Sequence, residues 1–112
     1  MDRNYIPVRT KKETVRVYLD EIIYIEKRKR KTVLVTENGQ IVFYCSMAYI
    51  KNYTDERFMD CHRSYLFNMD KIRRMADQTV YMDMDFCVFL GRESFRKGRR
   101  IFSSYMNKGI SR

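Results

Sequence analysis

The segment Thr32–Thr36 (TVLVT), followed by Asn38-Gly39 and then Gln40–Tyr44 (QIVFY), decides the fold class of this chain. Both runs are rich in β-branched and aromatic residues, which favour strands. An Asn-Gly pair between two such runs is the strongest short-range sequence signal for a β-hairpin. We therefore predict two antiparallel strands joined by a tight turn at this pair.

Strand-like patterning continues on both sides of this hairpin. Residues Glu13–Leu19 alternate between apolar and polar, as expected for a half-buried strand. Polar turns at residues 76–78 and 83–85 separate three segments near the C-terminal end. Further strands are predicted at Ile22–Glu26, Phe58–Cys61, Ile72–Met75, Thr79–Met82 and Phe86–Leu90. The chain is therefore expected to be mainly β.

Two segments have helical character instead. Ser46–Tyr53 begins with a side chain that caps helix N-termini well. Glu93–Asn107 places most of its large apolar residues near one face, as an amphipathic helix does. Gly98 lies inside this second segment and costs about 1 kcal/mol relative to alanine. We predict a short helix and a longer one.

Length and charge limit the classes of function. The 112 residues are enough for one domain with its own core, and 45% of them are hydrophobic. The net charge of +9 at pH 7 exceeds what solubility requires and indicates a polyanionic partner, with nucleic acid ranked before an anionic membrane. No apolar run approaches the roughly 18 residues of a membrane helix, and no signal peptide opens the chain. We expect a cytoplasmic protein without a membrane partner.

Residue types needed for catalysis or metal binding are sparse. The three cysteines are widely spaced and form no CxxC pair, which indicates neither a disulfide framework nor a zinc site. His62 is the only histidine, and Cys61 beside it would point to the opposite face of a strand. Asp83 and Asp85 have no third carboxylate nearby to complete a metal site. We predict no enzyme activity, no metal and no cofactor.

Basic residues gather in three segments. Five succeed one another at Lys27–Lys31, between two predicted strands, so we expect them in a hairpin loop where a polyanion neutralises their mutual repulsion. A second group comprises Arg92, Arg96, Lys97, Arg99 and Arg100, and a third comprises Lys71, Arg73 and Arg74. One basic face would account for all three, although solvated surface charge remains the open alternative. Because no helix-turn-helix pattern is visible, contact through loops is expected.

Two segments resemble the LytTR family of DNA-binding domains. The first is Ile22–Glu26 (IIYIE), which is followed by basic residues and a β-branched strand. The second, Phe58–Asn68 (FMDCHRSYLFN), is similar to the family's signature of a Phe, a His-Arg-Ser segment and an Asn, with an Ile after it at Ile72. Thr79–Tyr81 and Val88–Arg92 continue the family's order. The resemblance covers roughly residues 7–102 of a single domain, 1–112, whose ends at 1–6 and 107–112 we expect to be flexible.

This resemblance implies an elongated, mainly antiparallel β fold of about ten short strands with one or two short helices. It also implies that loops on one side enter successive major grooves of DNA. The implied contact residues are Arg28, Lys29, Arg30 and Lys31 in the first loop, Arg63 and Ser64 in the second, and Arg92 at the third. His62 beside the second loop, and Arg96 and Lys97 from the second basic group, complete the predicted DNA-binding residues. Arginine forks suit guanine edges, whereas lysines mostly meet phosphates. His62 is expected to order its loop.

The implied partner is double-stranded DNA with tandem direct repeats, bound by a homodimer. Family members usually follow a receiver domain or a membrane sensor, so we expect the output domain of a two-component response regulator or a free-standing transcription regulator. Three other readings stay open. They are an RNA-binding or ribosome-associated basic β-domain, a nuclease that uses Asp83 and Asp85 with a metal ion, and a basic protein–protein module.

Overall fold

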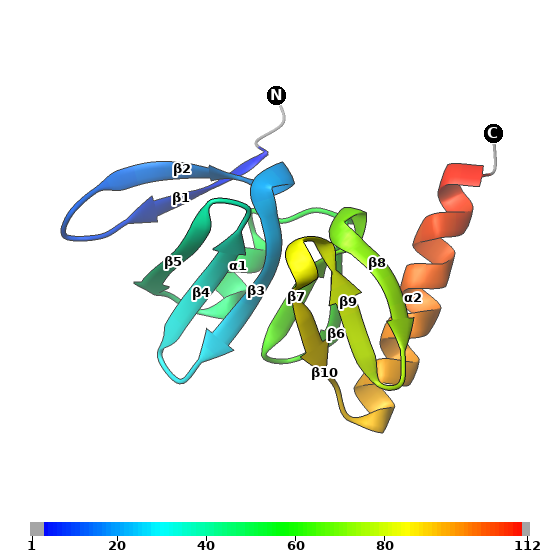
Figure 1. Cartoon of the computed structure of the whole chain (residues 1–112). Coiled ribbons are helices and arrows are strands. Elements are labelled where there is room, and N and C mark those ends of the chain that lie inside the picture. The colour runs from blue at the N-terminus through cyan, green and yellow to red at the C-terminus, as the bar shows by residue number, and fades with distance from the viewer. Residues whose placement is uncertain (1–3, 111–112) are drawn as a thin grey trace.

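Antiparallel strands dominate the computed structural model, which describes residues 4–110 (Figure 1). Ten strands lie in this range: β1 (Tyr5–Arg9), β2 (Thr14–Tyr18), β3 (Ile22–Arg28), β4 (Lys31–Thr36), β5 (Gly39–Tyr44), β6 (Phe58–His62), β7 (Tyr65–Asn68), β8 (Ile72–Ala76), β9 (Thr79–Met82) and β10 (Cys87–Phe89). The helices are α1 (Met47–Lys51) and α2 (Arg92–Ile110), with single 3-10 turns η1 (Leu19–Glu21), η2 (Met69–Lys71) and η3 (Asp83–Asp85). Every strand pairing is antiparallel, which confirms the predicted fold class.

The centre of the molecule is a five-stranded sheet in the order β5-β4-β3-β7-β6. The runs Ile22–Ile25 in β3 and Val33–Val35 in β4 are buried throughout, because both faces of this sheet are covered. One face packs against α2 and the three-stranded sheet β10-β9-β8. The other face packs against the β1–β2 hairpin and α1. The central sheet therefore lies between two layers, with one hydrophobic core on each of its faces (Figure 1).

The hairpin predicted around Asn38-Gly39 is present, but its turn lies one residue earlier. Glu37 and Asn38 form the two-residue turn, and Gly39 already pairs with Thr36 as the first residue of β5. Gly39 has a φ of +128°, a backbone conformation that side chains rarely adopt, so glycine is needed there. The Thr36 hydroxyl donates to the Gly39 carbonyl at 2.8 Å and closes the turn.

Helix α2 contains the predicted segment Glu93–Asn107 and begins one residue earlier, at Arg92. Gly98 lets this helix approach the sheets closely. A Cβ at this position would lie 3.1 Å from Cys61 Sγ and from Met75 Cε. The glycine that weakens the helix locally therefore allows it to pack.

Sequence patterning misses two strands, β1 and β7. Tyr5 and Ile6, which we expected in a flexible end, pair with β2, and Ile6 is fully buried in the core. The expectation of flexibility is therefore wrong for these residues, because the ladder orders them. At the other end, residues 107–110 continue α2. Residues 1–3 and 111–112 of the two expected flexible ends lie outside the described range.

Candidate nucleic-acid interface

Three connections lie along one edge of the molecule, the lower edge in Figure 1. They are the β3–β4 turn, the β6–β7 turn and the β10–α2 connection, and we call them together the loop edge. The Lys27 backbone N–H donates to the Ser64 carbonyl at 2.8 Å, so the first two connections lie side by side. The Leu90 N–H donates to the Gln78 carbonyl at 2.8 Å, and Gln78 Nε2 donates to the Leu90 carbonyl at 3.0 Å. These two hydrogen bonds fix the β10–α2 connection against the β8–β9 turn.

The β3–β4 turn is shorter than the run of five basic residues suggests. Arg28 and Lys31 pair with each other as the last and first residues of their strands, so only Lys29 and Arg30 form the turn. Lys29 has a φ of +56°. Lys27 has a structural role, because its Nζ donates to two backbone carbonyls, including that of Arg30 at 3.1 Å. Lys29 and Arg30 are exposed at the tip.

Side chains beside this turn have local partners. Arg28 forms an ion pair with Glu26 at 2.9 Å, and this hydrogen bond is the main reason why the pKa of Arg28 is raised. Lys31 Nζ lies 6.0 Å from the centroid of the Tyr44 ring, on the neighbouring strand. Tyr44 is 71% exposed, and sequence reasoning missed it as a candidate contact. Tyr44 pairs with Lys31 in the β4–β5 hairpin. Extending the predicted hairpin register to its last pair would therefore have placed Tyr44 beside the basic turn.

The β6–β7 turn consists of Arg63 and Ser64, between His62 and Tyr65. His62 Nδ1 accepts a hydrogen bond from the Ser64 backbone N–H at 3.0 Å, so the neutral ring carries its proton on Nε2. The His62 ring also lies 5.3 Å from the Tyr65 ring, centroid to centroid. His62 therefore orders the turn. Arg63 is exposed and has no ion pair within residues 4–110, which leaves its guanidinium available to a ligand.

The third connection places Arg92 as the first residue of α2, directly after Gly91. Arg92 is exposed and, within the part of the chain that the structure describes, has no ion pair. Arg96 and Lys97 follow one turn later and are also exposed. Cations near a helix N-terminus oppose the helix dipole at a cost of about 0.3–1 kcal/mol, whereas an anion there is stabilised. The electrostatics of this end therefore favour a phosphate.

The third basic cluster does not lie on the loop edge. Lys71 Nζ contacts Glu37 Oε2 at 2.6 Å, and Glu37 belongs to the β4–β5 turn, at the opposite end of β4 from the β3–β4 turn. Arg73 and Arg74 are exposed along β8, and Arg73 pairs with Asp83 at 3.7 Å. Lys71 is therefore held away from the loop edge, whereas Arg73 and Arg74 line one groove together with Arg96, Arg99 and Arg100 of the second cluster.

The weak sequence signals for chemistry find no support in the structure. Cys61 is buried, whereas its neighbour His62 is part-exposed. Burial raises the pKa of Cys61 to about 11, the opposite of what a nucleophilic thiol needs. Among residues 4–110, no group of three or more His, Cys, Asp or Glu side chains could hold a metal ion. None of the helices in that range is both long and apolar enough to cross a membrane.

Comparison with known proteins places this architecture. The sequence profile of a family described as the LytTr DNA-binding domain matches residues 12–102, which include all three connections of the loop edge. The chain belongs to the LytTR family. Its fold is similar to a solved LytTr DNA-binding domain from Bacillus cereus, of a protein described as a methyl-accepting/DNA response regulator. That LytTR structure has a TM-score of 0.65 and 20% sequence identity, covering 97% of this chain and 98% of the other. No match to this LytTR chain was found among curated protein sequences.

Proposed function

We propose that this LytTR domain binds double-stranded DNA sequence-specifically, by inserting its loop edge into major grooves, and acts as a bacterial transcription regulator or its output domain. The placement of Arg63 and Arg92 is the observation that carries this proposal. They occupy separate connections, each anchored to a neighbouring segment, and both are exposed without a carboxylate partner in the described range. An unpaired guanidinium can donate two parallel hydrogen bonds to O6 and N7 of guanine.

The other residues of the loop edge divide by chemistry. Lys29 and Arg30 lie in the β3–β4 turn, and Arg96 and Lys97 lie one helical turn beyond Arg92. These four exposed cations would neutralise phosphates, which fixes register without reading sequence. Contacts of Arg28, Lys31, His62 and Ser64 with DNA also belong to the proposal. Arg28 would approach a phosphate while keeping its ion pair, and His62 would act through the shape of its turn.

The alternative of an RNA-binding or ribosome-associated β-domain has weaker support. Recognition of splayed RNA bases uses aromatic rings that stand side by side on an open sheet. Here Tyr24, Tyr65 and Phe67 pack together in the core, with ring centroids 5.3 to 6.3 Å apart. The exposed rings of Tyr18, Tyr44 and Phe89 lie on three different sheets. A duplex read by loops is the better match to this surface.

In this proposal the chain works in the cytoplasm as one domain, residues 1–112, and binds DNA without catalysis or a cofactor. Two copies occupy tandem direct repeats as a homodimer, and a receiver or sensor domain controls them.

Selection of binding sites from a random duplex pool tests this function. We expect an enriched motif repeated in the same orientation at about one helical turn, 10–10.5 base pairs. If roughly 6–8 phosphates are neutralised, the logarithm of the association constant should fall with the logarithm of salt concentration at a slope of about −5 to −7. A slope near zero, no enriched motif, or stronger binding to single-stranded RNA would contradict the proposal. Magnesium-dependent plasmid cleavage would instead indicate the nuclease.

A further inference from the structure

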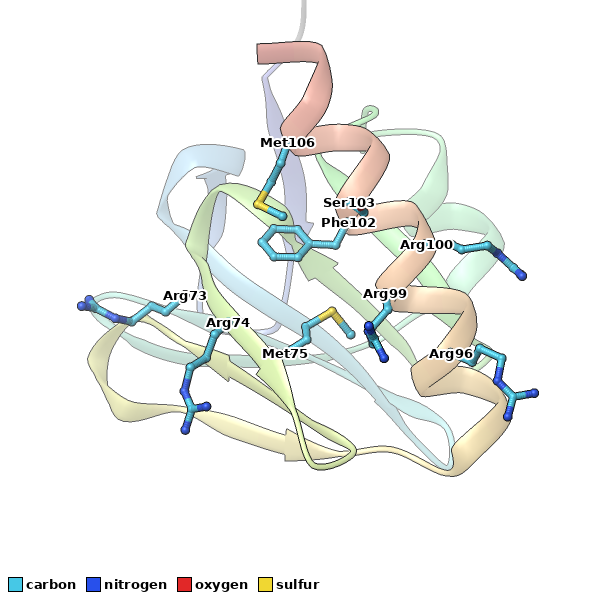
Figure 2. Close-up of a pocket in the computed structure, with 9 residues that line it drawn as sticks. All are labelled: Arg73, Arg74, Met75, Arg96, Arg99, Arg100, Phe102, Ser103 and Met106. Atoms are coloured by element: carbon cyan, nitrogen blue, oxygen red, sulfur yellow. The ribbon is translucent and has the colours of Figure 1, made fainter. Parts of the chain in front are cut away.

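A groove with an apolar floor runs between β8 and α2 and meets the loop edge only at Arg96, and most of the arginines that line it carry their guanidinium groups at its outer rims (Figure 2). It encloses about 670 Å³ and is lined by Arg73, Arg74, Met75, Arg96, Arg99, Arg100, Phe102, Ser103 and Met106. Figure 2 shows Met75, Phe102 and Met106 pointing into the space between the strand and the helix. The proposed DNA contact explains only the end nearest Arg96. That contact leaves the rest of the groove without an assigned role.

The arginines of this groove lack the partners that would make them structural. No carboxylate lines the groove, and within the described range Arg73 alone among the five forms an ion pair, at 3.7 Å. Arg74 lies over the Tyr81 ring at 4.2 Å from its centroid, and Arg99 lies 6.0 Å from the Phe95 centroid. Aromatic faces therefore position both guanidinium groups while their hydrogen-bond donors stay free for an anion.

The apolar floor of the groove argues against a nucleic-acid backbone as its ligand. Met106 is 49% exposed and Met75 is half-buried, so an apolar, adaptable surface lies between the charges. A phosphate chain would leave this surface uncovered, whereas interfaces between proteins are enriched in Met, Arg and aromatic residues. Along α2, Met106 lies about 21 Å from Arg92 at 1.5 Å per residue, so a duplex on the loop edge need not reach it.

We propose that this groove docks an acidic, amphipathic polypeptide segment of a partner protein, independently of DNA. Carboxylates of the segment pair with Arg74 and Arg99, and its apolar side chains cover Met75, Phe102 and Met106. Arginine clusters are a recurring means of recognising acidic motifs. Because the groove shares only Arg96 with the loop edge, the domain can hold DNA and the partner at once.

Fluorescence anisotropy with a labelled peptide tests this proposal. The probe has about 16 residues, long enough to span roughly 24 Å as a helix, with Glu on one face and Leu and Phe on the other. Two control peptides carry Gln for Glu, or Ala for Leu and Phe. We expect only the probe to bind, and Arg74→Glu or Arg99→Glu to raise its dissociation constant at least about fivefold. Met106→Gln should weaken it too, and the exposed Lys12→Glu should leave it unchanged.

Methionine methyl NMR of the wild-type chain locates the binding. The probe should shift the Met75 and Met106 signals and leave the DNA affinity of the chain unaltered. Equal binding of the Gln peptide, no binding of the probe, or equal losses in Lys12→Glu would overturn the proposal. Duplex DNA that shifts the same two methyl signals would show instead that the groove belongs to the DNA interface. A chain that binds the probe but shows no DNA specificity would contradict the proposed DNA binding and not the peptide docking. The two proposals can therefore be tested separately.

Discussion

Asn68→Ala should destabilise the domain strongly although this residue touches no proposed ligand. Asn68 is fully buried, and its Nδ2 donates to the carbonyls of Ile22 at 2.8 Å and Leu19 at 3.3 Å. Its Oδ1 accepts the Asp70 backbone N–H at 3.0 Å and caps η2. One side chain therefore connects the two short turns that lead into β3 and β8.

The expected loss of stability in Asn68→Ala follows from the backbone groups that lose a hydrogen-bond partner. The Leu19 carbonyl keeps its bond from the Ile22 N–H, so its loss is small. The buried Ile22 carbonyl loses its side-chain donor at about 1–3 kcal/mol, and the lost cap adds about 1 kcal/mol. The free energy of unfolding should fall by roughly 2–4 kcal/mol, which lowers Tm by roughly 8–16 °C for a domain of this size.

Thermal and urea unfolding measure this loss, with Asn52→Ala as the control because Asn52 is exposed and its backbone makes the helix-capping bonds. The control should stay within about 0.5 kcal/mol of wild type. Asn68→Asp should lose more near pH 7, because a carboxylate then faces carbonyl oxygens. Its folded-state pKa would be raised, so its stability should recover as pH falls through that raised pKa, and the recovery should be complete below about pH 4. A loss under about 0.5 kcal/mol for Asn68→Ala would refute this reasoning.

Three further predictions concern packing and titration. Gly98→Val should cost about 2–3 kcal/mol in urea unfolding, since a branched side chain would overlap atoms already 3.1 Å from an added Cβ. A thiol reagent near pH 8 should modify the exposed Cys87 rapidly and the buried Cys61, whose pKa is about 11, only after unfolding; equal rates would contradict this. Burial and the Asp70 hydrogen bond raise the pKa of Tyr105 to about 12, so its contribution to stability should be complete below about pH 10 and lost toward pH 12. Tyr105→Phe should remove that part of the alkaline loss, and an unchanged profile would argue against it.

The sequence predicts most of this fold because the signals are local. The Asn38-Gly39 hairpin, α2 and the strands before and after them follow from residue type and period. The strands that sequence patterning misses depend on distant partners. Ile6 is ordered by pairing with Val17, and β7 is completed by its position between β3 and β6. A run of charged residues does not indicate which way each side chain points. The sequence therefore predicts a loop position for Lys27, whereas its side chain donates to backbone carbonyls.

The candidate site divides in the same way. Arg63 and Ser64 could be placed in one contact loop because they lie in the segment that resembles the LytTR signature, although the strand that follows them was missed. The exposed Tyr44 required the β4–β5 register, and the groove between β8 and α2 brings together residues about 30 positions apart in sequence. The local density of charge suggested one continuous basic face, but ion pairs such as Lys71 with Glu37 place part of that charge elsewhere.

The affinities of Arg63→Ala and Lys29→Ala for three duplexes test the central claim most directly. The duplexes are the selected site, the same site with one guanine replaced, and a random sequence, each at two salt concentrations. Arg63→Ala should lose about 1–3 kcal/mol on the selected site and little on the other two, with relaxed preference at one position. Lys29→Ala should weaken all three alike and reduce the salt slope by about one. Equal losses of Arg63→Ala on all three duplexes would show that its role is electrostatic only, and would contradict base reading by the β6–β7 turn.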